Sequence, residues 1–206
     1  MKGTMDATNA AQAPPRHRWK ALLGLALVAL ALGTVSALPW QDNTLEYKVK
    51  AAFLYNFARY TEWPEGTFEK DDSPLVFAVV GEDPFGEILK ATVKGKELNG
   101  RPLKLEHFKD LKDLLAAKTG CHVLFVSDSL NKQQPEVHKA LMTRPMFTVS
   151  DLDDFAALGG TARFFIKSNT ISFTINQSSA KRQGLTISSQ LLKLAKLVED
   201  AEGLGK

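Results

Sequence analysis

Few residues of this chain are of types that carry out chemistry, and their spacing matches no catalytic or metal centre. Beyond residue 37 there are three histidines, His107, His122 and His138, and a single cysteine, Cys121. No histidine stands at a ligand-like spacing from another histidine or from the cysteine. Cys121 and His122 are neighbours in an apolar segment typical of a strand, so their side chains should point to opposite faces. We therefore expect no metal, no cofactor, no catalytic residues and no enzymatic activity.

The acids and the cysteine lead to the same expectation. Asp151, Asp153 and Asp154 lie close together, but acids are favoured at the start of a helix and a calcium loop needs more oxygen ligands. Cys121 opens an apolar segment, which favours a small buried side chain; a reactive thiol is the alternative. As the only cysteine, it can form no disulfide within the chain.

Two turns are candidates for ligand binding. In GEDPFG, residues 81–86, Asp83 is placed to cap a helix and Pro84 to occupy its first position, with the helix over residues 85–91. A helix start after a strand can hold an anion on backbone N–H groups, although both glycine-rich phosphate motifs are absent and ordinary capping is the alternative. A second polar turn follows Gly184, where hydroxyl groups can cap the last helix or contact a polar ligand. The candidate ligand-binding residues are Asp83, Phe85, Ser188, Ser189 and Gln190.

The segment YKVKAAFLYNFARYTEWP, residues 47–64, predicts a helix with an unusually aromatic surface. Asp42, Asn43 or Thr44 can cap its start, and Pro64 should end it near residues 60–62. At 100° per residue two sides are apolar: Val49, Phe53, Phe57 and Tyr60 on one, Tyr47, Ala51, Leu54 and Ala58 on the other.

Only a narrow strip of this helix, formed by Lys48, Asn56 and Arg59, is polar. A core helix between a sheet and a neighbouring element explains the pattern. Contact of part of the helix with a second protein chain explains it too, because Tyr, Phe, Trp and Arg are enriched in interfaces. The candidate partner-binding residues are Lys48, Asn56, Arg59, Tyr60 and Trp63.

The remaining chain alternates between apolar runs and helical patterns. Strands are predicted at residues 75–80, 103–108, 121–126 and 146–149, with helices between them. Residues 164–166 and 171–175 flank Ser168-Asn169 and predict a hairpin, and residues 185–198 predict an amphipathic helix. The expected fold is α/β: a mostly parallel sheet with helices on both faces, an antiparallel hairpin at the edge, and N-terminal and C-terminal helices.

The first 37 residues have the features of a secretory signal peptide. A basic stretch with Arg16, Arg18 and Lys20 precedes an apolar run over residues 21–32 and the small residues Val35-Ser36-Ala37. We expect cleavage after Ala37; an uncleaved membrane anchor is the alternative, for which the run is short. Residues 38–206 then form a single domain with 22 basic and 22 acidic residues, so total charge gives no reason to expect nucleic acid as a partner.

Several segments occur in an order that resembles one protein family. They are YKVKAAFLYNFARYTEWP, GEDPFG, GRPL, CHVLFVS, FTVSD, the Gly-Gly pair before a strand, ISFTIN and GLTISSQLLKLAKLV. Together they span residues 45–198 and closely resemble the YfiR-like family of exported bacterial proteins. The chain lacks the cysteines that form disulfides in some relatives, so redox control is not expected to carry over.

The resemblance implies a periplasmic regulatory protein that commonly forms homodimers. Its expected partner is the periplasmic part of an inner-membrane diguanylate cyclase, which it inhibits, thereby limiting cyclic di-GMP signalling and biofilm formation. The alternative is a periplasmic sensor domain that binds a small ligand and has no cyclase partner. Such a ligand is expected at the carboxyl ends of the strands, where open α/β sheets keep their sites.

Overall fold

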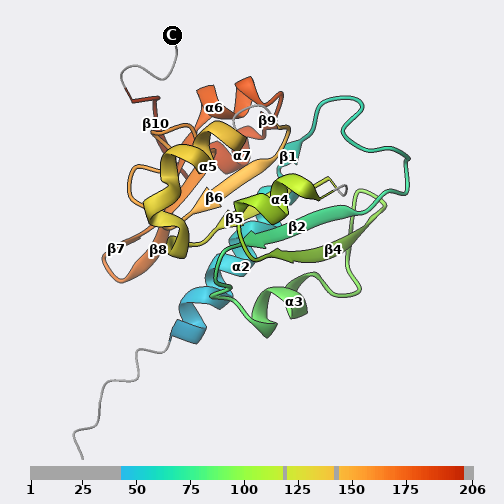
Figure 1. Ribbon diagram of the computed structural model, residues 1–206, viewed down its shortest axis with the longest axis horizontal. Coiled ribbons are helices and arrows are strands. Elements are labelled where there is room, and N and C mark those ends of the chain that lie inside the picture. The colour runs from blue at the N-terminus through green and yellow to red at the C-terminus, as the bar shows by residue number, and fades with distance from the viewer. Residues whose placement is uncertain (1–42, 118–119, 142–143, 202–206) are drawn as a thin grey trace, which may run out of the picture. The chain divides into compact units, whose positions relative to one another are not determined.

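The computed structural model describes residues 43–117, 120–141 and 144–201 (Figure 1). The expected signal peptide, its cleavage site and the Asp42 cap lie outside these residues. Helix α2, Asn43–Arg59, opens the described chain and is followed by a turn at Tyr60, so it ends within a residue of the expected position.

The centre of the fold is a mixed sheet to which the described residues contribute eight strands, in the order β10-β8-β7-β6-β5-β2-β4-β3. The strands are β2 Leu75–Val80, β3 Glu97–Leu98, β4 Arg101–Phe108, β5 Val123–Val126, β6 Phe147–Ser150, β7 Ala162–Lys167, β8 Thr170–Asn176 and β10 Lys196–Val198. Strands β4, β2, β5, β6 and β7 are mutually parallel. The expected α/β fold with a mostly parallel sheet is confirmed.

Continuous apolar runs form the middle of the sheet because both faces of these strands are covered. Every residue of β2, β5 and β6 is buried. Along β2, Phe77 and Val79 belong to one hydrophobic core, and Ala78 and Val80 belong to the other. The alternation of a strand thus divides the interior into two cores.

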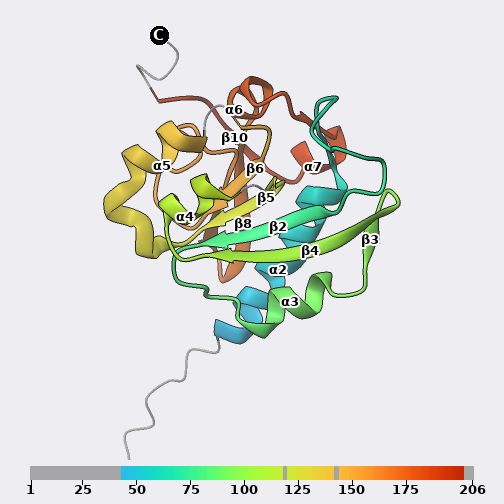
Figure 2. The ribbon, with the colours of Figure 1, turned by 45° about the vertical axis from the view of Figure 1, so that its right-hand side comes forward.

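Helices cover both faces of the sheet (Figure 2). Helices α2, α3 (Glu87–Val93), α6 (Gln177–Arg182) and α7 (Ser189–Leu192) contribute buried residues to the first core. Helices α4 (Leu111–Ala116) and α5 (Gln134–Leu141), with the 3₁₀ helix η1 (Asp128–Gln133), contribute to the second. Phe57 of α2 is fully buried and stacks on Phe147 at 4.9 Å between ring centres. The core interpretation of the apolar sides of α2 is therefore correct.

The predicted hairpin is present as β7 and β8, which pair antiparallel. Ser168 and Asn169 join them with φ of 48° and 60°, the positive values of the tight turn that suits twisted hairpins. The short strand β10 pairs parallel with β8 on its other side. Strand β7 pairs with β6 only through Ala162 and Arg163, so the hairpin extends past the carboxyl ends of the parallel strands.

Two predicted helices begin or end elsewhere. Helix α3 begins at Glu87, not at Phe85, because Gly86 has a positive φ of 52° and Phe85 is drawn into the core. The predicted helix over residues 185–198 is divided into strand β9 (Thr186–Ile187), the single turn α7, and β10. Strand β9 pairs with β1 (Thr61–Glu62), and the open edge of β8 binds residues 196–198, so backbone pairing replaces helical hydrogen bonds at both ends. Strand β5 likewise begins at Val123, two residues after Cys121.

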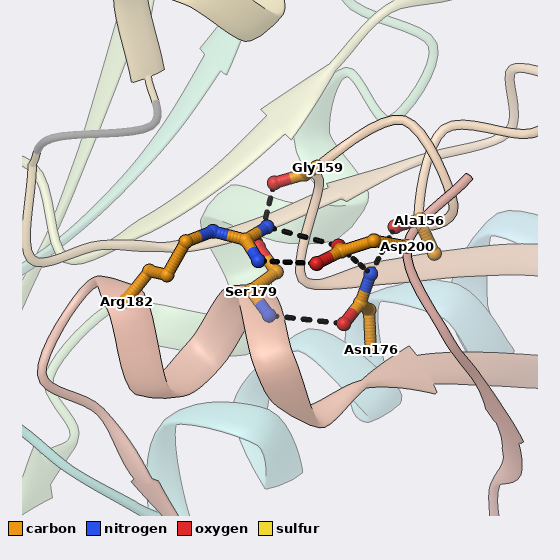
Figure 3. A network of polar contacts seen from close by, with 6 residues as sticks. All are labelled: Ala156, Gly159, Asn176, Ser179, Arg182 and Asp200. Atoms are coloured by element: carbon orange, nitrogen blue, oxygen red, sulfur yellow. Dashed lines mark hydrogen bonds and ion pairs between the residues drawn. The ribbon is translucent and has the colours of Figure 1, made fainter. Parts of the chain in front are cut away.

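A polar network that is buried at Asn176 and exposed at Arg182 fixes the segment after β10 to the rest of the domain (Figure 3). Asn176, at the end of β8, is fully buried, and its Nδ2 donates to Ala156 O and Asp200 Oδ1 at 2.8 Å each. Its Oδ1 accepts from Ser179 N. Asp200 also pairs with Arg182, which lowers the pKa of the Asp200 carboxyl. The network thereby joins three segments that are distant in sequence: the loop at Ala156, the junction of β8 and α6, and Asp200 after β10.

Candidate functional sites on helix α2 and at the carboxyl end of the sheet

The predicted polar strip of α2 lies on the surface of the domain. Lys48 and Arg59 are exposed, and Asn56 is half-buried between them. Neither Lys48 nor Arg59 has an ion-pair partner among the described residues. The Arg59 guanidinium lies 5.6 Å from the centre of the Tyr60 ring and makes a cation–π contact with it at the end of the helix. The strip is available to a second molecule.

The aromatic residues after the strip are less available. Tyr60 and Trp63 are half-buried and pack against the first core. The Trp63 ring lies 6.2 Å from Phe68 and 6.0 Å from His122, both edge-on. Its Nε1 is buried and has no hydrogen-bond partner among the described residues. Trp63 therefore contributes to the packing of the domain, in addition to any contact with a partner.

The two candidate ligand-binding turns are at opposite ends of α2. Phe85 contacts Tyr47 near the start of the helix, with ring centres 5.2 Å apart. Ser188 N donates to Tyr60 O at its end, at 2.9 Å. A helix rises 1.5 Å per residue, so the turns are about 20 Å apart. They therefore cannot form one pocket.

Local contacts account for each candidate ligand residue. Phe85 is 2% exposed and belongs to the core, and the exposed Asp83 accepts from Phe85 N through Oδ1 at 2.8 Å, so it forms a turn and does not cap α3. Ser188 caps α7 by accepting from Gln190 N at 3.3 Å. Ser189 and Gln190 are exposed, and neither lines the depression of about 150 Å³ formed beside them by α6 and β9. The capping role is the one that the geometry supports for Ser188.

A buried lysine that the sequence reasoning missed forms the floor of another site. Lys50 of α2 is 4% exposed. Its Nζ lies 2.5 Å from Glu46 Oε1 and 2.8 Å from both carboxylate oxygens of Asp151, which follows β6. It also lies 4.7 Å from the centre of the Tyr47 ring. One cation thus joins helix α2 to the end of a central strand.

The pKa values around Lys50 reflect one cation shared by two acids. Burial favours the neutral amine, but the hydrogen bonds to Asp151 and Glu46 outweigh it, so the pKa of Lys50 is raised. Burial raises the pKa of Asp151. The hydrogen bond and charge of Lys50 oppose this effect but do not cancel it, because Lys50 also pairs with Glu46 and because the nearby Glu46 and Asp128 raise the pKa further. Burial also raises the pKa of Tyr47. At neutral pH the lysine is charged and the tyrosine is protonated.

These residues line a cleft of about 450 Å³ at the carboxyl ends of β5 and β6. Asp128 follows β5 and Asp151 follows β6. The projecting hairpin supplies the opposite wall with Arg163, which pairs with Asp153, and with the 62% exposed Ile166. The cleft has a charged floor and a wall of mixed polarity, and it lies in the position where open α/β sheets keep their ligands.

A comparison with protein families identifies the chain. The family model described as YfiR/HmsC-like matches residues 47–196, from the first turns of α2 to the start of β10. The chain belongs to the YfiR/HmsC-like family. The resemblance found in the sequence is confirmed, and membership supports a periplasmic regulator over an enzyme.

In this YfiR/HmsC-like chain, the signal for the missed site was a charge within an apolar stripe. Lys50 stands three residues after Tyr47 and four before Leu54, so it shares a side of α2 with both. A lysine there must either extend to solvent or find acids, and Glu46 stands one turn before it. Asp151 is 101 residues further along the chain, and no local pattern connects it to Lys50.

Three further features belong to the described part of this YfiR/HmsC-like domain. There, no group of three or more His, Cys, Asp or Glu side chains is arranged to hold a metal ion. None of the helices in that part is long and apolar enough to cross a membrane. Cys121 is half-buried beside the second core, and burial raises the pKa of its thiol.

Proposed function

We propose that this protein is a periplasmic regulator that inhibits an inner-membrane diguanylate cyclase by direct contact with the cyclase's periplasmic part. It thereby limits cyclic di-GMP signalling and biofilm formation. The observation that carries the proposal is the family match over residues 47–196. The proposal includes export through a signal peptide cleaved after Ala37, and a homodimeric state that sedimentation equilibrium would test.

The exposed strip of α2 is the proposed contact surface. Lys48 and Arg59 are exposed cations without ion-pair partners among the described residues, and the strip lies on a helix held rigid by its buried aromatic side. Rigid presentation lowers the entropic cost of association. With an expected net charge of zero after export, recognition depends on placed groups and not on total charge. Arg59 is the strongest candidate, since arginine is enriched among interface residues that dominate affinity.

Replacement of Arg59 tests the contact surface. Arg59→Ala is expected to weaken association with the cyclase by about 2 kcal/mol or more, about 30-fold, and to raise cyclic di-GMP in cells. Its thermal unfolding should match that of the parent, because Arg59 is exposed. Lys112→Ala, which removes an exposed cation from α4 on the other face of the sheet, is the matched control. Unchanged inhibition by a normally folded Arg59→Ala protein would remove this strip from the interface.

A small-molecule sensor is the second candidate function, and the cleft floored by Lys50 is the observation that favours it. The cleft has charged, hydroxyl and apolar groups in one place at the carboxyl ends of the strands. Native mass spectrometry of protein purified from its own periplasm should then show a bound small molecule that is lost in Asp128→Ala. A wild-type spectrum of the unliganded mass alone would reject this candidate.

A further inference from the structure

A second cavity lies at the opposite end of the sheet from the Lys50 cleft. It has a volume of about 530 Å³ and is lined by Thr67, Phe68, Ser73, Pro74, Gly120 and His122, among others. The segment before β2 forms one side, and the segment before β5 forms the other. We call it the His122 recess. Its volume is within the range of small-molecule sites, about 300–1,000 Å³.

The imidazole of His122 is fixed in one tautomer. It is 4% exposed, and its Nδ1 accepts a hydrogen bond from Val76 N at 3.0 Å. Burial and the nearby Arg101 lower the pKa of His122 to about 4, so the ring is neutral at neutral pH. A neutral ring that accepts at Nδ1 carries its hydrogen on Nε2.

The Nε2–H group has no acceptor within the described part of the chain. No described residue accepts a hydrogen bond from Nε2. The atom is also not fully enclosed by the described part of the protein. Because His122 lines the recess, this donor has access to its interior. Water can reach this donor in the free protein, so a ligand acceptor would replace a water and gain the modest net free energy of one hydrogen bond.

The wall of the recess is held in place before any ligand arrives. The Phe68 ring stacks on His122, with ring centres 4.4 Å apart and 8° between the planes. The Arg101 guanidinium lies 3.8 Å from the centre of the same ring. Arg101 Nη1 also donates to Lys70 O and Ser73 O, which secures the segment that carries Phe68. A pre-formed wall lowers the entropic cost of binding.

We propose that the His122 recess binds a small, uncharged organic molecule whose carbonyl oxygen accepts a hydrogen bond from His122 Nε2 and whose apolar body packs against Phe68 and Pro74. An uncharged ligand suits the recess because Glu69 at its exposed side and Arg101 behind Phe68 have opposite charges. A charged ligand would lose its hydration without a dedicated counter-ion. The recess is separate from the α2 strip and from the Lys50 cleft.

Two probes of similar shape test the hydrogen bond. Benzamide has a ring and a carbonyl group, whereas toluene has the ring alone. Each is titrated into the purified protein, and the nitrogen resonances of His122 and the amide of Val76 are followed by NMR. Benzamide should bind about fivefold or more tightly than toluene and shift the His122 Nε2 resonance, as expected for one neutral hydrogen bond. Equal binding of both probes, or no benzamide binding up to its solubility, would overturn the proposal.

Substitutions at Gly120 test the location. A Cβ built on Gly120 has as its nearest neighbour the His122 ring, at an ordinary contact distance of 3.9 Å, so side chains fit there without backbone strain. Gly120→Leu should fill the recess and abolish benzamide binding, while Gly120→Ala should retain it. Both variants should have the melting temperature of the parent within a few degrees. Benzamide binding that survives Gly120→Leu in a folded protein would place the probe elsewhere and overturn the proposal.

Discussion

Replacing Lys50 with methionine should destabilise the domain, and the size of the effect follows from the geometry of its two acids. Methionine keeps most of the side-chain volume and removes the charge. Glu46 and Asp151 then remain with oxygens at most about 5.3 Å apart, since both contact the same nitrogen in the parent protein. Two such charges repel by about 1–3 kcal/mol for effective dielectric constants of about 20–60.

The loss of the pair adds to this repulsion but is moderated by solvent. Removing one member of a fully buried ion pair costs about 3–5 kcal/mol. Here the side chains of Glu46 and Asp151 are 28% and 25% exposed, so water partly compensates both acids. We therefore expect Lys50→Met to lower the free energy of unfolding by about 2–3 kcal/mol at pH 7. The melting temperature should fall by about 5–10 °C for a domain of this size.

The stability lost in Lys50→Met should depend on pH. Burial already raises the pKa of Asp151, and in the variant Lys50 no longer opposes this, so the folded-state pKa of Asp151 lies further above its unfolded value of about 4. The folded state then binds more protons than the unfolded state, so stability relative to the parent recovers as pH falls from 7 towards 4.5. In the parent, the raised pKa of Lys50 contributes stability that is lost only as pH rises above about 10.

Urea unfolding of both proteins at pH 7 and pH 4.5 measures these quantities. Lys48→Met is the matched control, because Lys48 is an exposed lysine of the same helix and should change stability by no more than about 0.5 kcal/mol. Adding Asp151→Asn to Lys50→Met should restore about 1 kcal/mol or more by removing one of the two repelling charges. A loss in Lys50→Met no larger than in the control, or a loss equal at both pH values, would refute the reasoning.

Three further predictions concern single side chains. The thiol of Cys121 should react slowly with a thiol reagent in native protein, because burial raises its pKa, and Cys121→Ser should cost about 1–3 kcal/mol in a urea titration; rapid native labelling would contradict this. Ser188→Ala should lower the free energy of unfolding by about 0.5–1 kcal/mol through loss of the α7 cap, whereas Ser189→Ala, at an exposed position without that bond, should have a smaller effect. Since the folded-state pKa of His122 is lowered to about 4, stability should fall by about 3 kcal/mol as the pH drops from about 6.5 to about 4, where the unfolded state is protonated and the folded state is not, and should level off below that. NMR titration of the His122 ring should give the low pKa directly, and a midpoint near 6.5 would contradict the buried neutral ring.

The sequence alone determined those features that depend on local pattern. Residues 75–80 form a continuous apolar run bounded by Pro74 and Gly81, and a run of that length favours a strand covered on both faces. Ser168 and Asn169 readily adopt the positive φ of a tight turn, which located the hairpin. The ordered motifs indicated the YfiR/HmsC-like family, because their similarity does not depend on knowing which residues touch.

Only the tertiary structure decided which distant groups meet. Lys50 is stable in the interior because Asp151 reaches it from 101 residues away. Residues 196–198 have a helical pattern, yet the open edge of β8 offers backbone partners that draw them into the sheet. The two candidate ligand turns are held about 20 Å apart by the length of α2. His122, just before β5, lines a cavity while its Nδ1 accepts a hydrogen bond from Val76 of β2, 46 residues earlier in the chain. For Lys50, residues 196–198 and His122, the deciding energy comes from desolvation or from hydrogen bonds between segments far apart in the chain, and such energies leave no periodic pattern in the sequence.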